Sequence, residues 1–411
     1  MGNVNAADTA WMLVSTALVL LMIPGLAFFY GGLVGRKNVL SIMMQCVILM
    51  GAISIQWVLF GYGLAFGPDH GGVIGDFSWA MLRGVGMEPN QDYAATIPHQ
   101  LFMVFQMMFA VITPALIVGA IAERMKFSAF LLFSLLWATL VYDPMAHWVW
   151  GVGGWVRDLG ALDFAGGTVV HVNAGMAALA AALAVGRRRG YPDGFAPHNL
   201  PFAVLGAALL WFGWFGFNAG SALGAGGLAV SAFVGTHVAA AAAALAWAVV
   251  EWVTRRRPTV LGTISGAVAG LVAVTPAAGF VTPLGAVLIG ILAGVACYVS
   301  VVVLKGRLGY DDSLDAFGIH GVGGIVGALL TGVLATTLVN PAGADGLLYG
   351  GGALVLIQVV AIVACAAYSF VVSLGLLKLV DRVVGLRVGR DDESIGLDLT
   401  QHRETAYTIV R

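Results

Sequence analysis

The chain has 411 residues, of which 60% are hydrophobic and 10% are charged, and its formal net charge is −1. Soluble domains are about half apolar and a quarter charged, so this composition, with a mean hydropathy of +0.93, predicts an all-α polytopic membrane protein. The near-neutral charge gives no case for nucleic-acid binding. Three cysteines, Cys46, Cys297 and Cys365, lie far apart inside apolar runs. Their spacing favours small buried residues over a disulfide framework or a metal site.

The N-terminus carries Asp8 but no Lys or Arg before the first apolar run, which begins near Trp11. A secretory signal peptide opens with a positively charged region, so we expect no cleaved signal. Eleven apolar segments are long enough to span a bilayer. They cover approximately residues 11–32, 42–66, 100–121, 128–148, 163–186, 200–221, 229–253, 260–278, 283–304, 315–337 and 350–379. The longest predicted outer loop, 67–100, carries Pro and Gly and should be irregular.

Basic residues follow every second span. They are Arg36, Lys37, Arg124, Lys126, Arg187, Arg188, Arg189, Arg255, Arg256, Arg257, Lys305 and Arg307, followed after the last span by Lys378, Arg382, Arg387, Arg390, Arg403 and Arg411. The remaining two, Arg83 and Arg157, fall in the alternate loops. The positive-inside rule therefore predicts an outer N-terminus and a cytoplasmic C-terminus. We predict a transmembrane domain, 1–379, and a polar cytoplasmic tail, 380–411, which more resembles a docking segment than a folded domain.

Two sequence features recur five spans apart. Thr113-Pro114-Ala115 in the third span matches Thr275-Pro276-Ala277 in the eighth, and the fifth and tenth spans each combine an acid with a histidine. Because five is odd, the second copy must be inverted, as in many transporters with a site at the midplane. We predict two inverted five-helix repeats, 11–186 and 200–337, plus an eleventh helix, 350–379.

The fifth span contains DFAGGTVVHVNAG, with Asp163 and His171, and the tenth contains DAFGIHGVGG, with Asp315 and His320. Ionisable residues inside a membrane are expensive and need a partner or a cavity. Inverted repeats would bring the two imidazoles together at mid-depth, where they offer a donor and an acceptor without fixed charge. Helix capping and substrate contact are both open for Asp163, and we interpret Asp315 as a cap.

Aromatic residues give a further indication. Trp148, Trp150 and Trp155 lie at the outer end of the fourth span, where an interfacial belt is the default interpretation. Phe109 and Phe217 lie inside the third and sixth spans. Packing or lipid contact is their default role, and cation–π recognition of an ammonium group is the alternative.

The stretches DFAGGTVVH, WFGFNAGSA, FGIHGVGG and GLDLTQHRETAY resemble the ammonium transporter family (Amt/Mep/Rh), on its bacterial Amt side, and the resemblance covers the chain from Trp11 to Tyr407. It implies a homotrimer in the plasma membrane, with one hydrophobic channel in each subunit. It also implies an outer recruitment site of Phe109, Trp150 and Ser221 supported by Asp163, a gate of Phe109 and Phe217, and twin pore histidines, His171 and His320. It implies no cofactor, and a PII-type signalling protein that docks at the tail.

These observations predict uptake of ammonium, with methylammonium as an analogue. Neutral ammonia crosses an apolar pore far more cheaply than ammonium, so deprotonation outside and passage as ammonia are expected, with or without a separately relayed proton. The alternatives are a sensor of the same family, an intramembrane enzyme using Asp163 with His171, and a path for another small neutral molecule. An intramembrane enzyme would need a nucleophile or a metal, and the sequence has no recognisable motif for either.

Overall fold

The computed structural model describes residues 4–192 and 196–407; residues 1–3, 193–195 and 408–411, which include the end of the predicted tail, lie outside the described residues. The α-helices of the first part are α1 (Ala6–Leu33), α2 (Val39–Gln56), α3 (Tyr62–Phe66), α4 (His99–Ile121), α5 (Phe127–Trp137), α6 (Asp143–Trp150), α7 (Trp155–Asp158), α8 (Asn173–Val185) and α9 (Leu200–Gly220). Those of the second part are α10 (Gly227–Arg255), α11 (Val260–Val274), α12 (Pro283–Tyr298), α13 (Lys305–Leu308), α14 (Val322–Leu334), α15 (Gly352–Val384), α16 (Arg390–Ile395) and α17 (Leu397–His402).

Short turns of other helix types interrupt or extend these helices. Five are π-helical: η2 (Trp57–Gly61), η4 (Ala138–Tyr142), η5 (Gly167–Val172), η6 (Val299–Leu304) and η7 (Phe317–Gly321). Three are 3₁₀ turns: η1 (Arg36–Asn38), η3 (Ala80–Leu82) and η8 (Leu347–Tyr349). π-Helical turns are rare and frequently lie at functional sites, so η5 and η7, which carry the two predicted histidines, are of particular interest.

Within the described residues, ten helices are long and apolar enough to cross a membrane, and each coincides with a predicted span. The remaining predicted span, 260–278, contains the shorter α11, which ends at Val274. Thr275 still has helical dihedrals, but Pro276 has no N–H to donate, and the backbone continues in three-residue turns in which the Ala277 N–H donates to the Val274 carbonyl at 2.9 Å. The last long helix, α15, runs on to Val384, beyond the predicted start of the tail.

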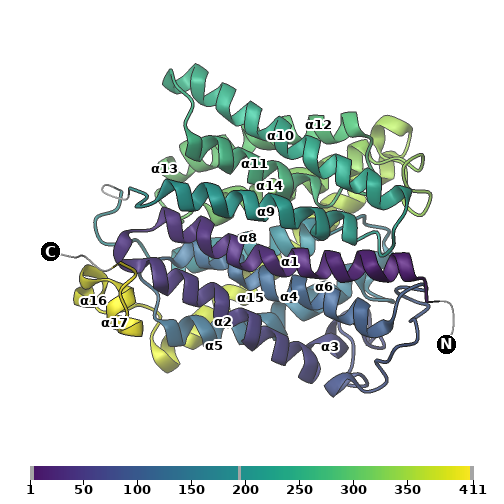
Figure 1. The fold of residues 1–411 in the computed structure, drawn as a ribbon, viewed down its shortest axis with the longest axis horizontal. Coiled ribbons are helices and arrows are strands. Elements are labelled where there is room, and N and C mark those ends of the chain that lie inside the picture. Colours follow the sequence, from purple (N-terminus) through teal and green to yellow (C-terminus); the bar gives the residue numbers. More distant parts are fainter. Residues whose placement is uncertain (1–3, 193–195, 408–411) are drawn as a thin grey trace.

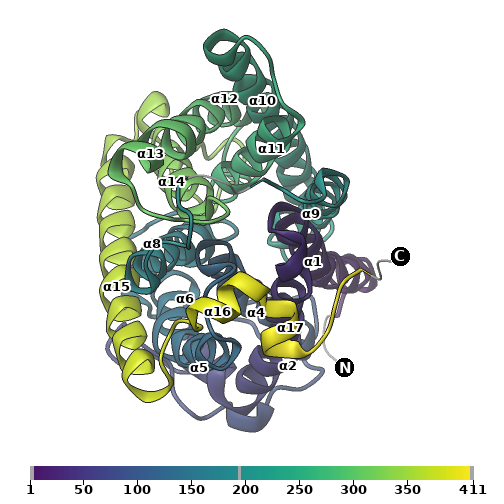
Figure 2. The ribbon, with the colours of Figure 1, turned by 90° about the vertical axis from the view of Figure 1, so that its left-hand side faces the viewer.

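The long helices pack side by side into a bundle, with the N-terminus at one end and the C-terminus at the other (Figure 1). Figure 2 looks onto the end covered by α16 and α17, which is called the tail face below; the other end is the opposite face. Helices α1 and α9 lie in close contact because α9 turns small residues toward α1: a Cβ on Gly206 would stand 2.1 Å from the Phe29 nitrogen. Small residues let helices approach closely in lipid.

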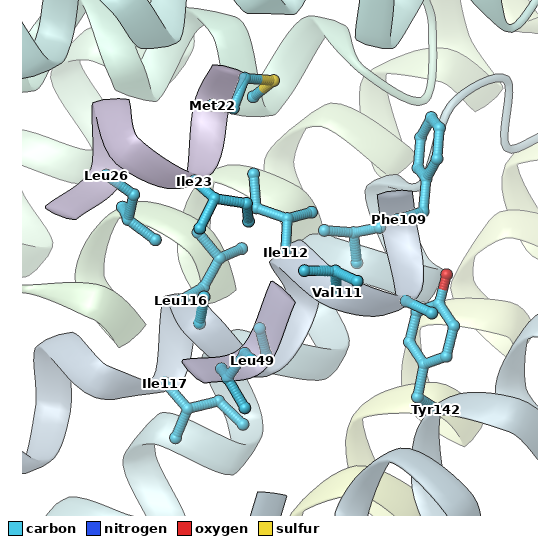
Figure 3. Close-up of a cluster of buried hydrophobic side chains, with 14 of the residues drawn as sticks. Met22, Ile23, Leu26, Leu49, Phe109, Val111, Ile112, Leu116, Ile117 and Tyr142 are labelled. Carbon is cyan, nitrogen blue, oxygen red and sulfur yellow. The ribbon is translucent and has the colours of Figure 1, made fainter. Parts of the chain in front are cut away.

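The largest buried apolar cluster draws side chains from most of the helices, and Figure 3 shows the part of it that α1, α2 and α4 contribute. Met22, Leu26 and Ile112 belong to this cluster and are nearly inaccessible. Helix α4 is buried on almost all sides, as its uniformly apolar sequence indicates. The three cysteines are buried and unpaired, as predicted.

A buried ionic network joins the helix ends at the tail face. Arg124 is fully buried and donates to the carbonyl oxygens of Gly186 and Asp311, each at 2.7 Å. Burial lowers the pKa of Arg124 to about 10, which leaves it charged at neutral pH. Arg188 pairs with Glu123 at 2.7 Å and with Asp311 at 2.9 Å. Loops from both predicted repeats are therefore held together by charge-assisted hydrogen bonds.

Up to residue 407, the tail docks on this network. The Val388 N–H donates to the Arg124 carbonyl at 3.0 Å, and the Leu397 N–H donates to the Asn38 side chain at 2.8 Å. The Asp398 carboxylate accepts from the Ser41 N–H at 2.8 Å. The tail therefore lies across the ends of α2 and α4, as Figure 2 also shows.

Candidate functional site

Asp163 caps the segment that carries His171. One carboxylate oxygen accepts from the N–H groups of Gly166 (2.7 Å) and Gly167 (2.6 Å), and the other accepts from the N–H (2.8 Å) and hydroxyl (2.5 Å) of Thr168. Gly166 has φ +112°, which only glycine adopts readily, and this turn brings the backbone donors onto the acid. The helix therefore starts at Gly167, not at the predicted residue 163. Asp163 therefore has the capping role that the sequence analysis left open.

The predicted cap of the tenth span is wrong. Asp312, not Asp315, accepts from the N–H groups of Ala316 (3.0 Å) and Phe317 (2.8 Å) at the start of η7. Asp315 has φ +62°, which turns its side chain toward Lys305, with which it forms an ion pair. Asp163 and Asp312 each precede their histidine by eight residues, so the two caps are equivalent.

We expect Asp312→Ala to lower the melting temperature and the transport rate more than Asp315→Asn does. The first change removes a buried cap worth about 1 kcal/mol, whereas the second removes a partly exposed ion pair worth about 0–1 kcal/mol. Asparagine is chosen at 315 because it tolerates positive φ. Thermal unfolding of the two purified variants measures the difference. Equal destabilisation, or a larger effect at Asp315, would contradict the assignment of the cap.

His171 and His320 meet inside the bundle. Their Nδ1 atoms lie 3.3 Å apart, and the rings are nearly parallel with centroids separated by 5.4 Å. Both side chains are almost completely buried. One imidazole must donate to the other, so each ring keeps its Nε2 for another partner. His171 also stacks on Trp214 at 5.4 Å, and the Trp214 indole is fixed by a 2.9 Å hydrogen bond to Thr275. The geometric prediction for the two histidines is confirmed.

The histidines line a narrow cavity of about 10 Å³. Its walls are otherwise mostly apolar: Met22, Leu26, Phe29, Ile112, Leu116, Val170, Leu210, Trp214, Phe217 and Val268. A space of this size holds about one water-sized molecule. The chemistry of the walls suits a small neutral molecule with hydrogen-bonding groups, because a bare ion would lose its hydration without compensation.

A cavity of about 190 Å³ lies toward the opposite face and brings together Phe109, Trp150 and Ser221. The Phe109 and Trp150 rings meet edge to face at 5.8 Å, and the Trp150 indole donates to the Asp163 carbonyl at 2.9 Å. Phe109 also packs on Phe217, with centroids 4.3 Å apart. Because Phe109 lines this cavity and Phe217 lines the narrow one, the two rings form the partition between them.

A third cavity, of about 1170 Å³, opens at the tail face. Phe29 lines both this cavity and the narrow one, and Ile319, next to His320, lines it as well. Glu393 and Ser394 of the tail contribute to its rim. The three cavities thus follow one another through the bundle, with the histidines in the narrowest part.

Residues 10–407 match the profile of the Ammonium Transporter Family. An ammonium transporter of Bacillus subtilis (strain 168) is 56% identical over 402 residues, which cover 97% of this chain and 98% of that relative. The chain belongs to the ammonium transporter family. As a member, it is a multi-pass membrane transport protein and not an enzyme, which leaves the intramembrane enzyme without support.

Other family members agree along the whole chain. Ammonium transporter Amt1 of Archaeoglobus fulgidus is 49% identical over 403 residues, covering 98% of this chain and 99% of that relative. The crystal structure of Saccharomyces cerevisiae Mep2 superposes with a TM-score of 0.89 at 37% identity, covering 95% of this chain and 89% of that one. A structure described as a sensor Amt protein gives a TM-score of 0.90 at 30% identity, covering 96% and 98%.

Two glycines that the sequence analysis did not single out let the histidines of this family member meet. A Cβ on Gly175 would stand 2.2 Å from the Gly321 nitrogen, and a Cβ on Gly324 would stand 3.1 Å from the His171 Cβ and 2.9 Å from the Val172 nitrogen. Each glycine follows its own histidine by four residues, which is one helical turn. The shared spacing Asp-x7-His-x3-Gly, from Asp163 to Gly175 and from Asp312 to Gly324, was therefore present in the sequence as a signal.

We expect Gly324→Val to separate the histidines and reduce transport at least roughly ten-fold, because the added methyl groups meet backbone atoms that cannot move aside without shifting η5. Gly375→Val is the matched control, since a Cβ at Gly375 meets nothing within 4 Å. Uptake of radiolabelled methylammonium, normalised to membrane-inserted protein, measures the effect. Equal uptake by the two variants would show that the close contact between Gly324 and η5 does not determine how the two histidines are placed.

Trp148 does not lie in an interfacial belt, which was the default interpretation of the outer tryptophans. It is only 8% exposed, its indole donates to the Val73 carbonyl at 2.8 Å, and its ring packs on Trp155 and Tyr368. The loop after α3 covers it, so Trp148 is part of the packed interior and not of an interfacial belt.

Proposed function

We propose that the chain takes up ammonium through a pore that runs the length of the bundle. The observation that carries this proposal is the alignment of three cavities, with two buried imidazoles at the narrowest point and a wider cavity on each side. The pore offers hydrogen bonds without a fixed charge, which suits ammonia and disfavours metal cations.

In this proposal Phe109, Trp150 and Ser221 recruit ammonium at the opposite face. The aromatic faces attract the cation, and the Ser221 hydroxyl oxygen can accept one of its N–H groups. Asp163 supports this site indirectly: its carboxylate accepts hydrogen bonds from backbone N–H groups, and its backbone carbonyl holds the Trp150 indole in place. Phe109 and Phe217 form the gate, since the molecule must pass this partition to reach His171.

Ammonium loses its proton before the gate opens, and ammonia passes His171 and His320 toward the tail face. The histidines donate to and accept from ammonia, and they offer a route for the separated proton. Net transport is either of ammonia alone or of ammonia plus the relayed proton. Ammonium-dependent current across a bilayer that contains the purified protein separates the two: absence of current excludes the electrogenic form.

Eleven spans in two inverted repeats are supported by features five spans apart. The fifth and tenth spans share the Asp-x7-His-x3-Gly spacing and begin with π-helical turns, and π-helical turns also occur in the fourth and ninth. The hydroxyls of Thr113 and Thr275 both donate to the carbonyl four residues earlier. Basic residues gather at the tail face, which supports a cytoplasmic tail and an outer N-terminus in the plasma membrane.

A homotrimer is supported by the exposed surface of α9 and α10. His237 is exposed about 15 Å along α10, within its membrane-spanning part, one turn after Phe233 (40% exposed), and its ring packs on Trp211 of α9 with centroids 5.4 Å apart. A polar ring facing lipid is unfavourable, so we propose that a second copy of the chain covers this face. Native mass spectrometry should give the mass of three chains; a monomer would refute the trimer.

A PII-type regulator is proposed to dock at the tail face. The docked tail borders the cavity through Glu393 and Ser394, so a protein bound there would cover the mouth of the pore. Binding of a purified PII protein to the full-length chain, compared with a chain ending at residue 389, tests this partner.

Growth tests the proposed function. Cells that lack their own ammonium transporters should grow on low ammonium when they express this chain, and methylammonium should compete. Failure to grow, with the protein present in the membrane, would refute ammonium uptake. Equal competition by carbon dioxide would favour a path for other small neutral molecules.

A sensor of ammonium with secondary conduction is the second candidate, favoured by the similarity to a structure described as a sensor Amt protein. A sensor would bind ammonium and change its contacts at the tail face while carrying little of it. Binding without measurable uptake in the same preparation would favour the sensor over the transporter.

A further inference from the structure

The wall of the large cavity at the tail face contains a carboxylate that the proposed path does not use. Glu251 lies in α10 and is 4% exposed. Its Oε2 accepts from the Thr259 N–H at 2.8 Å and from the Thr259 hydroxyl at 3.0 Å. Capping of α11 accounts for these bonds. Acidic side chains within membrane-spanning helices are nevertheless rare and commonly belong to substrate or ion pathways.

Trp247 lies one turn before Glu251 and lines the same cavity. It is 3% exposed, and its indole N–H has no hydrogen-bond partner among the described residues. Buried indole N–H groups usually find an acceptor, so this donor indicates that something else binds there.

Gly262 defines where these two groups point. A Cβ at Gly262 would stand 2.4 Å from Glu251 Oε2 and 2.8 Å from Trp247 Nε1. A carboxylate acceptor and an unpartnered donor therefore converge beside a residue that has no side chain. Ser265, one turn further along α11, lines the same cavity. Lys305, also in this wall, is already paired with Asp315.

We propose that Glu251, Trp247 and Ser265 form a second binding site for the transported molecule, where it leaves the apolar part of the pore; this rests on the ammonium transport proposed above. Ammonia accepts one hydrogen bond through its lone pair, which the Trp247 N–H supplies, and donates to the Glu251 carboxylate and the Ser265 oxygen.

Protonation by a hydronium ion from the solvent then gives ammonium and water. Ammonium has no lone pair, so the Trp247 contact is lost, while attraction to the Glu251 carboxylate stabilises the charged product. The site therefore holds ammonia as it emerges and favours its protonation on the tail side.

Methylammonium uptake into membrane vesicles of both orientations tests this site. Glu251→Gln keeps an oxygen for Thr259 but removes the charge, and Gly262→Ala places a methyl group where the two polar atoms converge. We expect both variants to raise the half-saturating concentration measured from the tail side at least roughly five-fold, with less than a two-fold change from the opposite side. Thr263→Ala, in the same helix but partly exposed and outside the cavity lining, is the matched control and should change neither value.

An unchanged tail-side value in Glu251→Gln and Gly262→Ala, or equal changes from both sides, would overturn the site. If Glu251→Gln does not insert into membranes, Gly262→Ala alone decides. These outcomes differ from failure of the proposed function, in which the unaltered chain would carry no methylammonium in either orientation.

Discussion

Replacing His171 with alanine is expected to lower methylammonium uptake roughly 10- to 100-fold. His171 and His320 supply the polar atoms of an otherwise mostly apolar cavity of about 10 Å³. A polar molecule that loses one hydrogen bond in such a place is destabilised by about 1–3 kcal/mol, and each 1.4 kcal/mol corresponds to about ten-fold in rate. Uptake into cells, normalised to inserted protein, measures the change.

His70→Ala is the matched control, because His70 is exposed in the loop after α3 and does not line any of the three cavities described above. Its uptake should equal that of the unaltered chain. The selectivity of His171→Ala for methylammonium over potassium should also be measured. Unchanged uptake together with unchanged selectivity would remove the imidazole from the path.

Asp163→Asn is expected to abolish transport and to lower the melting temperature of the purified protein. In Asp163, both carboxylate oxygens accept hydrogen bonds from backbone N–H groups. Asparagine replaces one of these oxygens with an N–H₂ group, which cannot accept, so some of these backbone donors lose their acceptor. Hydrogen bonds to a charged acceptor contribute about 1.5–3 kcal/mol each, and unsatisfied buried donors add a further penalty. The segment that positions His171 and Trp150 should therefore lose its fixed geometry.

Thermal unfolding and methylammonium uptake together test this expectation. Asp158→Asn, at an exposed residue that ends α7, makes the same chemical change away from the cap and should leave both quantities unaltered. A stable Asp163→Asn protein that still transports would mean that the carboxylate's hydrogen bonds do not organise the site.

Much of this architecture could be predicted because it depends on one-dimensional features. Apolar length locates membrane helices without knowledge of their packing, and ten of the predicted spans coincide with long apolar helices. Asp163, His171 and His320 were identified because polar residues are conspicuous in apolar runs. The two repeats were predicted to be inverted, and the histidines therefore to meet, only because the matching segments lie an odd number of spans apart.

Features that depend on backbone geometry or on distant loops were not predictable in the same way. Asp312 and Asp315 are both plausible caps by sequence, and the positive φ of Asp315 decides between them. The burial of Trp148 depends on a loop that lies far earlier in the chain. Gly175 and Gly324 were two among 57 glycines, and only their contacts distinguish them.

We propose that an apolar pore lined by His171 and His320 carries a nitrogen hydride and rejects hydrated cations. Flux of ammonium and of potassium into liposomes that contain the purified protein tests it most directly. We expect ammonium flux at least roughly 100-fold faster than potassium flux, because a bare cation finds no compensating charge in the narrow cavity. Potassium flux at a comparable rate, or no ammonium flux, would contradict it.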